Sequence, residues 1–360
     1  MSFVPGSQEN NHMTNRETHQ SQAAETVRDG VTIDDIAKRA NVSKSTVSRV
    51  LNGTAVVNEQ KRSAVHQAIA ELDYKPNVFA QGLASGKSMT LGILTQNIGS
   101  PFYDTIAQGA IEGLAGSGYT PIFVDGRWEH AREAAAIETL ISRKVDGLLV
   151  VGGDIDASEL QSYKTQLPLI VAARDIEGLE EQCVSVNNKQ IGYLATKHLL
   201  EQRHTRIAFI HGIEGHPDAQ NRFVGHVEAI QEAGLSLSDE LVYQGDFSGH
   251  AGLMAINYFL DQGICFSAIV AANDMVAFGA RLALYRRGIR VPDDVSIIGC
   301  DDQAEAAFMT PPLTTVRQPS YEMGVAASKA LIALIGKKNY EWPALNPELQ
   351  IRESVKRFTS

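Results

Sequence analysis

The sequence predicts an all-α helix-turn-helix head at the N-terminus, followed by an α/β core of two doubly wound lobes with parallel sheets. Three observations support this. A short helical motif occupies residues 32–52, and the net charge changes sign after residue 88. From residue 90 onward, apolar strand-like runs alternate with amphipathic helices, and this rhythm restarts near residue 188. A chain of 360 residues is long enough for two or three domains, each with its own core.

Composition excludes several classes of protein. The longest apolar runs, such as residues 147–152, are far shorter than the roughly 18–20 residues that span a bilayer. Residues 1–29 are polar and lack the apolar segment of a signal peptide, so we expect a disordered tail and a cytoplasmic protein without a membrane partner. Cys183, Cys265 and Cys300 lie far apart and predict buried free thiols rather than disulfides.

The helical motif at residues 32–52 has the signals of two helices joined by a tight turn. Thr32 and Asp35 form a capping-box pattern, residues 40–42 leave room only for a turn, and Ser43 can cap the second helix. A third helix is expected from Asn58. Apolar residues at helical spacing supply a core for the first two helices: Ile33, Ile36, Ala37, Ala40, Val47, Val50 and Leu51.

The charge distribution and the second helix indicate DNA binding. Residues 30–88 carry a net charge of +3, against −2 for residues 1–29 and −11 for residues 89–360. Attraction to phosphates is local because salt screens charges over about 8–10 Å. Short hydrogen-bonding groups and cations near a helix N-terminus can contact base edges and phosphates in the major groove. The predicted DNA-binding residues of the head are Thr32, Ser43, Lys44, Ser45, Thr46, Ser48, Arg49 and Asn52.

Residues 76–88 read as a hinge between the head and the core. Asn77 can cap a helix of about two turns, which is marginal alone in water, and Gly82 costs it roughly 1 kcal/mol more. Such a segment suits a helix that folds only on a partner. Leu83 would be its apolar tip and could wedge into a base step of the minor groove.

The core alternates strands and helices, which predicts parallel sheets covered on both faces. The expected strands are 91–94, 121–124, 147–151, 169–172, 184–186, 206–210, 241–243, 268–271 and 295–298. The expected helices include 105–115, 133–142, 191–201, 220–233, 275–287 and 323–334.

Side chains that follow the strands are the candidates for ligand binding, because doubly wound lobes bind ligands at the carboxyl ends of their strands. Together they offer aromatic faces, carboxylates, an amide and guanidinium groups, a combination that suits a polyhydroxylated ligand such as a sugar. Asn273 could instead be only a helix N-cap. The candidates are Phe102, Tyr103, Arg174, Asp175, Arg222, Phe247, Asn273 and Asp301.

The sequence lacks the motifs that other functions would require. A nicotinamide dehydrogenase needs Gly-x-Gly-x-x-Gly after its first strand, and residues 95–102 do not have that spacing. No Gly-x-Ser-x-Gly elbow is present, and His211 and His216 lack the spacing of a zinc pair and are expected to be solvated. We therefore expect neither an enzyme nor a cofactor or metal. A sugar-binding protein without a DNA role would have no use for residues 30–88.

Seven motifs resemble the lactose-repressor/galactose-repressor family of bacterial transcription regulators. The resemblance covers about residues 30–355 in the family's order. The motifs are Val31-Thr-Ile-Asp-Asp-Ile-Ala, Val42-Ser-Lys-Ser-Thr-Val-Ser-Arg-Val-Leu-Asn52, Tyr74-Lys-Pro-Asn77, Ala80-Gln-Gly-Leu83-Ala84, Ala272-Asn-Asp-Met-Val-Ala277, Gly299-Cys-Asp-Asp302 and Pro312-Leu-Thr-Thr315.

The resemblance implies a homodimer that binds a palindromic operator in double-stranded DNA and a core like the type I periplasmic sugar-binding proteins. A small effector in the cleft, a sugar or alternatively a purine or nucleoside, would control a repressor. No leucine heptad follows Arg352, which favours a dimer over a tetramer. The implied domains are a tail (1–29), a head (30–75), a hinge (76–88), an N-terminal lobe (89–188 plus 318–347) and a C-terminal lobe (189–317 plus 348–357).

Overall fold

The computed structural model describes residues 31–52, 57–74 and 87–359, without the side chain of Asn52. The chain forms two compact units, Met1–Asn77 and Val78–Ser360. The predicted tail and nearly all of the predicted hinge, including Asn77 and Leu83, lie outside the described residues. The predictions made for them remain predictions.

In the first unit, the head, residues 31–52 and 57–74 form three helices, α1 (Ile33–Arg39), α2 (Lys44–Asn52) and α3 (Glu59–Glu71). The predicted capping box is present, because the Thr32 backbone N and Oγ1 donate to an Asp35 carboxylate oxygen at 3.0 and 2.7 Å. Ser43 Oγ caps α2 by accepting from the Thr46 backbone N at 3.2 Å. The three helices bury a core of Ile36, Ala37, Val47, Val65, Ala68 and Tyr74.

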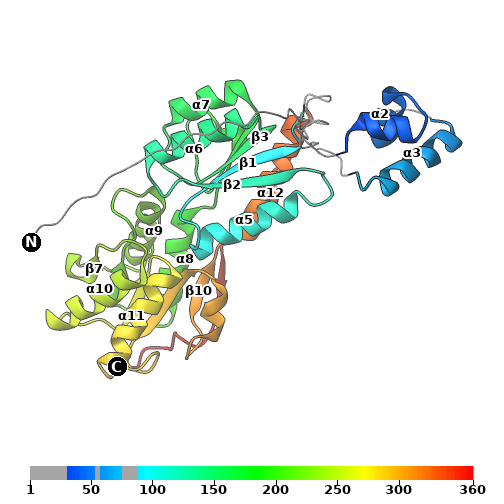
Figure 1. Cartoon of the computed structure of the whole chain (residues 1–360). Coiled ribbons are helices and arrows are strands. Elements are labelled where there is room, and N and C mark those ends of the chain that lie inside the picture. The colour runs from blue at the N-terminus through cyan, green and yellow to red at the C-terminus, as the bar shows by residue number, and fades with distance from the viewer. Residues whose placement is uncertain (1–30, 53–56, 75–86, 360) are drawn as a thin grey trace, which may run out of the picture. The chain divides into compact units, whose positions relative to one another are not determined.

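The N-terminal lobe of the core has a five-stranded parallel sheet in the order β2-β1-β3-β4-β5. Helices α5 and α12 pack together on one face, where orange α12 lies beside cyan α5 although they are far apart in sequence (Figure 1). Helices α6 and α7 cover the other face. The elements are β1 (Thr90–Thr95), α5 (Pro101–Gly113), β2 (Thr120–Asp125), α6 (His130–Ser142), β3 (Gly147–Val151), α7 (Ala157–Gln166), β4 (Leu169–Ala172), β5 (Cys183–Val184) and α12 (Ser320–Ile335).

The C-terminal lobe has a six-stranded sheet in the order β11-β10-β9-β8-β6-β7, parallel except for the edge strand β11. Helices α8 and α9 pack on one face, and α10 and α11 pack on the other. The elements are α8 (Asn188–Glu201), β6 (Ile207–Ile210), α9 (Pro217–Glu232), β7 (Val242–Tyr243), α10 (Gly249–Asp261), β8 (Ala268–Ala271), α11 (Asp274–Arg286), β9 (Ser296–Asp301), β10 (Thr314–Arg317) and β11 (Glu348–Gln350), with short 3₁₀ turns η1 (Glu180–Gln182), η2 (Asp239–Leu241) and η3 (Ala304–Phe308).

The chain passes between the lobes three times, after β5, after β10 and after α12. One apolar cluster extends from the α5 and α12 side of the N-terminal lobe to the α8 and α9 side of the C-terminal lobe. The lobes are therefore two sheets joined through a shared hydrophobic layer and three connections.

Glycine permits a close crossing of helices α8 and α9. A Cβ added at Gly192 would lie 1.8 Å from the Arg222 carbonyl oxygen, and one at Gly225 would lie 1.9 Å from the Lys189 carbonyl oxygen. No side chain fits at such distances, so these glycines set how near α9 lies to α8. This spacing fixes the backbone position of Arg222.

The predicted fold class is confirmed, and each expected strand overlaps an observed one. Strands β10 and β11 and helices α7 and α10 were not predicted. Observed helices begin one to four residues earlier than expected, as at Pro101 and Pro217, because the first helical turn lies ahead of the first apolar contact. Cys183 and Cys300 are buried as expected, whereas the prediction for Cys265 was wrong because it lies exposed after a loop glycine. No helix within the described ranges is long and apolar enough to cross a bilayer.

Candidate functional sites

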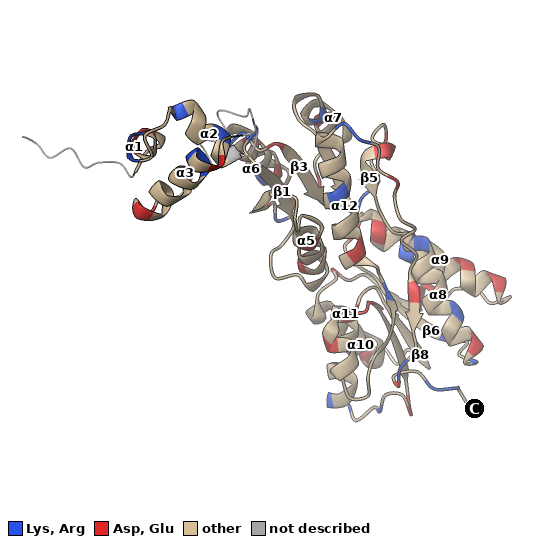
Figure 2. Ribbon diagram, turned by 90° about the vertical axis from the view of Figure 1, so that its right-hand side faces the viewer, with Lys and Arg blue, Asp and Glu red and all other residues tan. Residues whose placement is uncertain are grey.

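The outward face of α2 is polar, as the sequence predicted. Lys44, Ser45 and Arg49 are exposed, whereas Val47 points into the head core. Lys44 Nζ lies 2.6 Å from Asp34 Oδ1. Arg49 forms no ion pair with any residue that the structure describes. Figure 2 shows lysine and arginine positions, in blue, on both α1 and α2.

The remaining predicted residues of the head surround this face. Ser43 is exposed, Thr46 and Ser48 are half-buried, and Asn52 ends α2. Ser43 Oγ lies 2.9 Å from the hydroxyls of both Ser45 and Thr46. Thr32 is exposed at the start of α1, where its hydroxyl is held by Asp35. Most of the set therefore gathers at the N-terminal end of α2, on short side chains that local hydrogen bonds orient.

A cavity of about 320 Å³ lies between the two lobes of the core, at the carboxyl ends of their strands. Six of the eight predicted ligand-binding residues line it, namely Phe102, Tyr103, Arg222, Phe247, Asn273 and Asp301. The sequence reasoning missed the other lining residues, which are Asn97, Gly99, Ser100, Pro101, Trp128, Ile213, His216, Asp218, Asp246, Ser248, Met275 and Gln303.

A chain of aromatic rings crosses the cavity from one lobe to the other. In the N-terminal lobe the ring centroids of Tyr103 and Trp128 are 5.8 Å apart. The Trp128 ring meets His216 of the C-terminal lobe at 4.9 Å, and His216 meets Phe247 at 5.5 Å. A ligand between the lobes would thus find apolar ring faces supplied by both lobes.

Arg222 is the cation of the cavity and is only 5% exposed. Its Nε donates to Asn188 Oδ1 at 2.8 Å, and its Nη1 donates to the Ala272 carbonyl oxygen at 2.6 Å. Nη1 lies 3.8 Å from Asp301 Oδ1, which is too long for a hydrogen bond. The guanidinium also lies 5.7 Å from the centroid of the Phe247 ring.

Asp301 faces Arg222 from the end of β9 and is held by its own set of partners. Its Oδ1 accepts from Gln318 Nε2 at 2.7 Å, and its backbone has a φ of +113°, in a region that favours glycine. Strain of this kind at a non-glycine residue concentrates at functional sites. Arg222 and Asp301 are therefore each held by other residues of the protein, and they form no direct hydrogen bond with one another.

Burial governs the ionisation of the cavity. It raises the pKa of the Asp218 and Asp301 carboxyls, and nearby Arg222 opposes both shifts. Burial lowers the pKa of His216, so its imidazole is neutral near pH 7. Three carboxyl groups, those of Asp218, Asp246 and Asp301, thus line the cavity beside a single guanidinium.

Two buried side chains position the strand-end loops of the N-terminal lobe. Gln96 Oε1 accepts from the Trp128 backbone N at 2.8 Å. Glu133 Oε2 accepts from the backbone N of Asp154 and Ile155 at 2.8 and 3.1 Å, and burial raises the pKa of this carboxyl. The loop that carries Trp128 is held in place by these contacts.

The structure corrects the expected positions of Arg174, Asp175 and two histidines, and it places Asn273 both at the cavity and at a helix N-cap. Arg174 and Asp175 do not line the cavity, because Arg174 Nη1 donates to the Ile155 carbonyl oxygen and Asp175 accepts from Ser185 Oγ, both within their own lobe. Asn273 lines the cavity but is also an N-cap, since its Oδ1 accepts from the Val276 backbone N at 2.9 Å. The expectation of solvated histidines was wrong, because His211 is buried and His216 is half-buried between rings of the cavity.

Comparisons with known proteins agree with this arrangement. A family described as bacterial regulatory proteins, lacI family, matches residues 32–77, and a periplasmic binding protein-like domain matches residues 196–355. The chain is 33% identical to the HTH-type transcriptional repressor PurR of Photobacterium profundum, over 90% of this chain and 98% of that protein. It is 34% identical to the HTH-type transcriptional regulator GalR of Escherichia coli, over 84% of this chain and 89% of that protein.

Solved structures show the same relationship. The lac repressor dimer bound to operator and the anti-inducer ONPF aligns with a TM-score of 0.83 and 26% identity, covering 91% of this chain and 100% of that one. The complex of the transcriptional regulator CelR with cellobiose aligns with a TM-score of 0.67 and 31% identity, covering 90% of this chain and 99% of that one. The chain belongs to the lacI family of bacterial regulatory proteins and is a DNA-binding transcriptional regulator, not an enzyme.

Proposed function

We propose that this regulator is a homodimeric repressor that binds a palindromic operator through α2 and is controlled by an uncharged sugar in the cavity between its lobes. The observation that supports this proposal most strongly is the cavity, in which ring faces from both lobes surround the pair of Arg222 and Asp301. We place the protein in the cytoplasm, at the nucleoid, because that is where its DNA partner lies.

The charges that line the cavity favour an uncharged effector. A phosphorylated or carboxylated ligand would face Asp218, Asp246 and Asp301. The only lining guanidinium, that of Arg222, already donates to Asn188 and Ala272. Sugar hydroxyls, in contrast, both donate and accept, so one hydroxyl can bridge the 3.8 Å gap between Arg222 Nη1 and Asp301 Oδ1.

A ligand in this position can control DNA binding because it contacts both lobes. Ring faces come from Tyr103 and Trp128 on one side and from His216 and Phe247 on the other. A ligand shifts a conformational equilibrium only by its differential affinity for the two states. Contacts shared between the lobes supply that difference, since they form fully only at one separation of the lobes.

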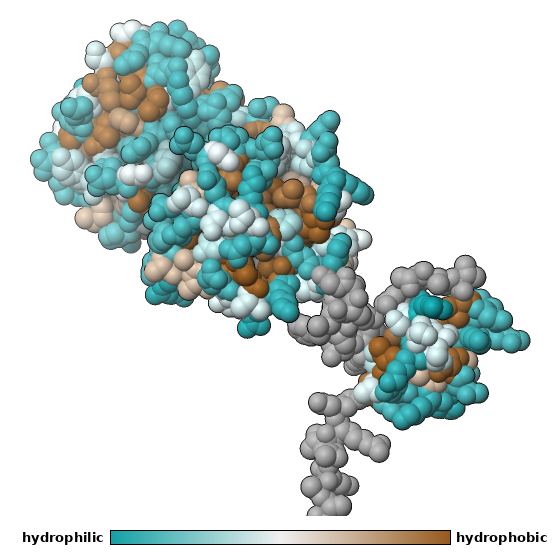
Figure 3. All heavy atoms as spheres, turned by 90° about the horizontal axis from the view of Figure 1, so that it is seen from above, coloured by the Kyte–Doolittle hydropathy of each residue, from teal (hydrophilic) through white to brown (hydrophobic). Residues whose placement is uncertain are grey.

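Exposed hydrophobic side chains support the proposed dimer. Leu282 and Tyr285 on α11 are 43% and 79% exposed, and Phe308 at the end of η3, after β9, is 86% exposed. Figure 3 shows brown hydrophobic patches on the surface of the core. Contiguous exposed apolar patches mark protein interfaces, and Leu282 and Tyr285, three residues apart, share one face of α11. The relatives of known structure include a dimer bound to operator.

Thermal unfolding of the intact protein tests the effector assignment. Both tryptophans, Trp128 and Trp342, lie in the core, so their fluorescence follows the unfolding of the core and not that of the head. We expect an uncharged sugar to raise the midpoint, since a ligand at 100 times its Kd stabilises by about 2.7 kcal/mol, whereas its phosphorylated form does not. Purines and nucleosides are tested in the same way. If they alone raise the unfolding midpoint, the result would favour a purine or nucleoside effector.

Two variants locate the binding site. Asp301→Asn should reduce the shift caused by the sugar, because a neutral amide oxygen replaces the charged carboxylate and accepts a weaker hydrogen bond from a ligand hydroxyl. Asp175→Asn is the matched control, since Asp175 is exposed and does not line the cavity. An undiminished shift in Asp301→Asn, or an equal loss in both variants, would contradict the assignment.

A further inference from the structure

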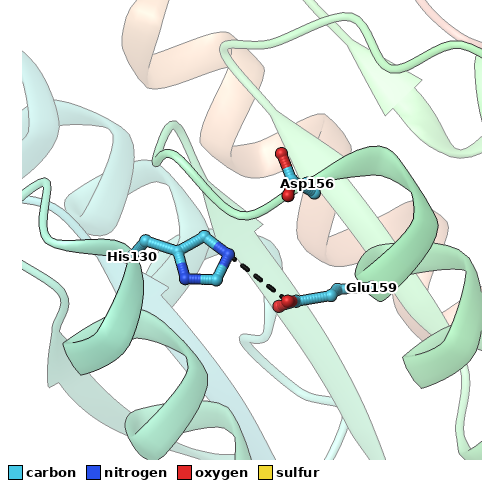
Figure 4. Close-up of side chains that lie close together, drawn as sticks. All are labelled: His130, Asp156 and Glu159. Atoms are coloured by element: carbon cyan, nitrogen blue, oxygen red, sulfur yellow. Dashed lines mark ion pairs between the residues drawn. The ribbon is translucent and has the colours of Figure 1, made fainter.

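One group of side chains outside the effector cavity has the composition of a metal site. His130 begins α6, Asp156 is the N-cap residue of α7, and Glu159 lies in the first turn of α7 (Figure 4). One ligand atom from each lies within 4.8 Å of the others. His130 Nε2 is 3.3 Å from Glu159 Oε1, the separation that two ligands of one tetrahedral ion have.

Apart from the ion pair between His130 Nε2 and Glu159 Oε1, the three side chains have no hydrogen bond or ion pair with another residue that the structure describes. An aspartate at an N-cap usually accepts a hydrogen bond from the helix start, yet the Asp156 side chain makes no such bond. His130 Nε2 and Glu159 Oε2 are both closed off from solvent and have no hydrogen-bond partner among the described residues. Polar atoms buried without partners are costly, so their convergence on one point indicates a ligand between them.

We propose that His130, Asp156 and Glu159 bind one divalent transition-metal ion of the Zn²⁺ type, with water completing its coordination. An imidazole nitrogen with two carboxylates suits Zn²⁺ and its neighbours, whereas Mg²⁺ and Ca²⁺ prefer sites made only of oxygen ligands. The side chains of His130 and Glu159 are about 40% exposed, so small rotations can shorten the remaining distances. No ion is part of the structure.

The position of the metal site suggests that a bound ion would connect two helices near the effector cavity. His130 follows Trp128 by two residues, and Asp156 follows the loop that Glu133 holds at Asp154. A bound ion would fasten the start of α6 to the start of α7 beside the loop that brings Trp128 to the cavity. The metal site is separate from the effector cavity, since none of its three ligands lines that cavity.

Calorimetric titration of the metal-free full chain with Zn²⁺ tests the proposal. The background carries His12→Asn and His19→Asn, which removes the tail histidines as competing ligands. We expect one ion per chain. His130→Asn and Glu159→Gln should each weaken binding about tenfold or more, as the loss of even an outer partner of a metal site does. His66→Asn, at an exposed histidine of α3, is the matched control and should leave the affinity unchanged.

Co²⁺ provides a second readout because its visible absorption reports imidazole and carboxylate coordination directly. The Co²⁺ spectrum should appear in the background protein and disappear in His130→Asn, with circular dichroism showing that the variant is folded. The proposal is overturned if Zn²⁺ does not bind in the micromolar range. It is equally overturned if His130→Asn and His66→Asn bind alike, or if 1:1 binding of Mg²⁺ is as tight as that of Zn²⁺.

Discussion

His226 should make the core sensitive to acid. The residue lies on α9, is fully buried, and packs against the Phe209 ring at 4.8 Å. Its Nδ1 lies 2.8 Å from Thr196 Oγ1, and because that hydroxyl donates to the Gly192 carbonyl oxygen, the imidazole is the donor to Thr196. Burial lowers the pKa of His226 to about 3, with no charged neighbour contributing.

The direction and size of the effect follow from linkage. The unfolded chain binds a proton at His226 below about pH 6.5, whereas the folded chain does not until about pH 3. The contribution to stability is therefore complete above pH 6.5 and is lost as the pH falls through that window. At pH 4.5 the loss spans about two pH units at roughly 1.4 kcal/mol each, or about 2–3 kcal/mol.

Urea unfolding at pH 7.0 and pH 4.5, followed by tryptophan fluorescence, measures this loss. His226→Leu should lower the stability at both pH values, yet its stability should fall by about 2–3 kcal/mol less between them than that of the unmodified protein. The exposed His250→Leu serves as control and should retain the full difference. The comparison is between the stability differences of each protein at the two pH values, so the contributions of the other buried titratable groups, which all the proteins share, cancel. Equal pH dependence in the protein with and without His226 would refute the reasoning.

Three further predictions concern the head, the helix crossing and the dimer. Arg49→Ala should reduce the preference for a selected duplex over random DNA by about 1–3 kcal/mol, measured by fluorescence anisotropy, and Arg62→Ala on α3 is the control. An unchanged ratio of the two DNA affinities would count against α2 as the helix that contacts the bases. Gly192→Ala should destabilise the core by about 1–3 kcal/mol in urea unfolding, because its Cβ would meet the Arg222 carbonyl oxygen; a neutral effect would show that α8 and α9 can separate freely. Tyr285→Glu should shift sedimentation from dimer to monomer, and an intact dimer would exclude that face.

Much of the candidate site was predictable because parallel strands end at one edge of a sheet. That rule correctly placed Phe102, Tyr103, Arg222, Phe247 and Asp301 at the cavity. Applied fully, it would also have found Trp128 after β2 and His216 before the helix that begins at Pro217.

What could not be predicted depends on contacts between segments distant in sequence. Arg174 follows β4 as the rule requires, yet its guanidinium turns back to Ile155, and no pattern along the chain indicates that hydrogen bond. The short edge strand β11 pairs antiparallel with β10 over only three residues, too few for a periodicity to show. The meeting of Trp128 with His216 likewise depends on how the two lobes are joined.

The most direct test of the account measures DNA binding by the intact protein with and without a sugar. A duplex selected by the protein from a random library is compared with unselected DNA, and the sugar is one that stabilises the core. We expect a preference of about 10³-fold or more for the selected duplex, and a change of about 5–150-fold in its affinity when the sugar is present. Equal affinity for all duplexes, unaltered by any sugar, would contradict the account.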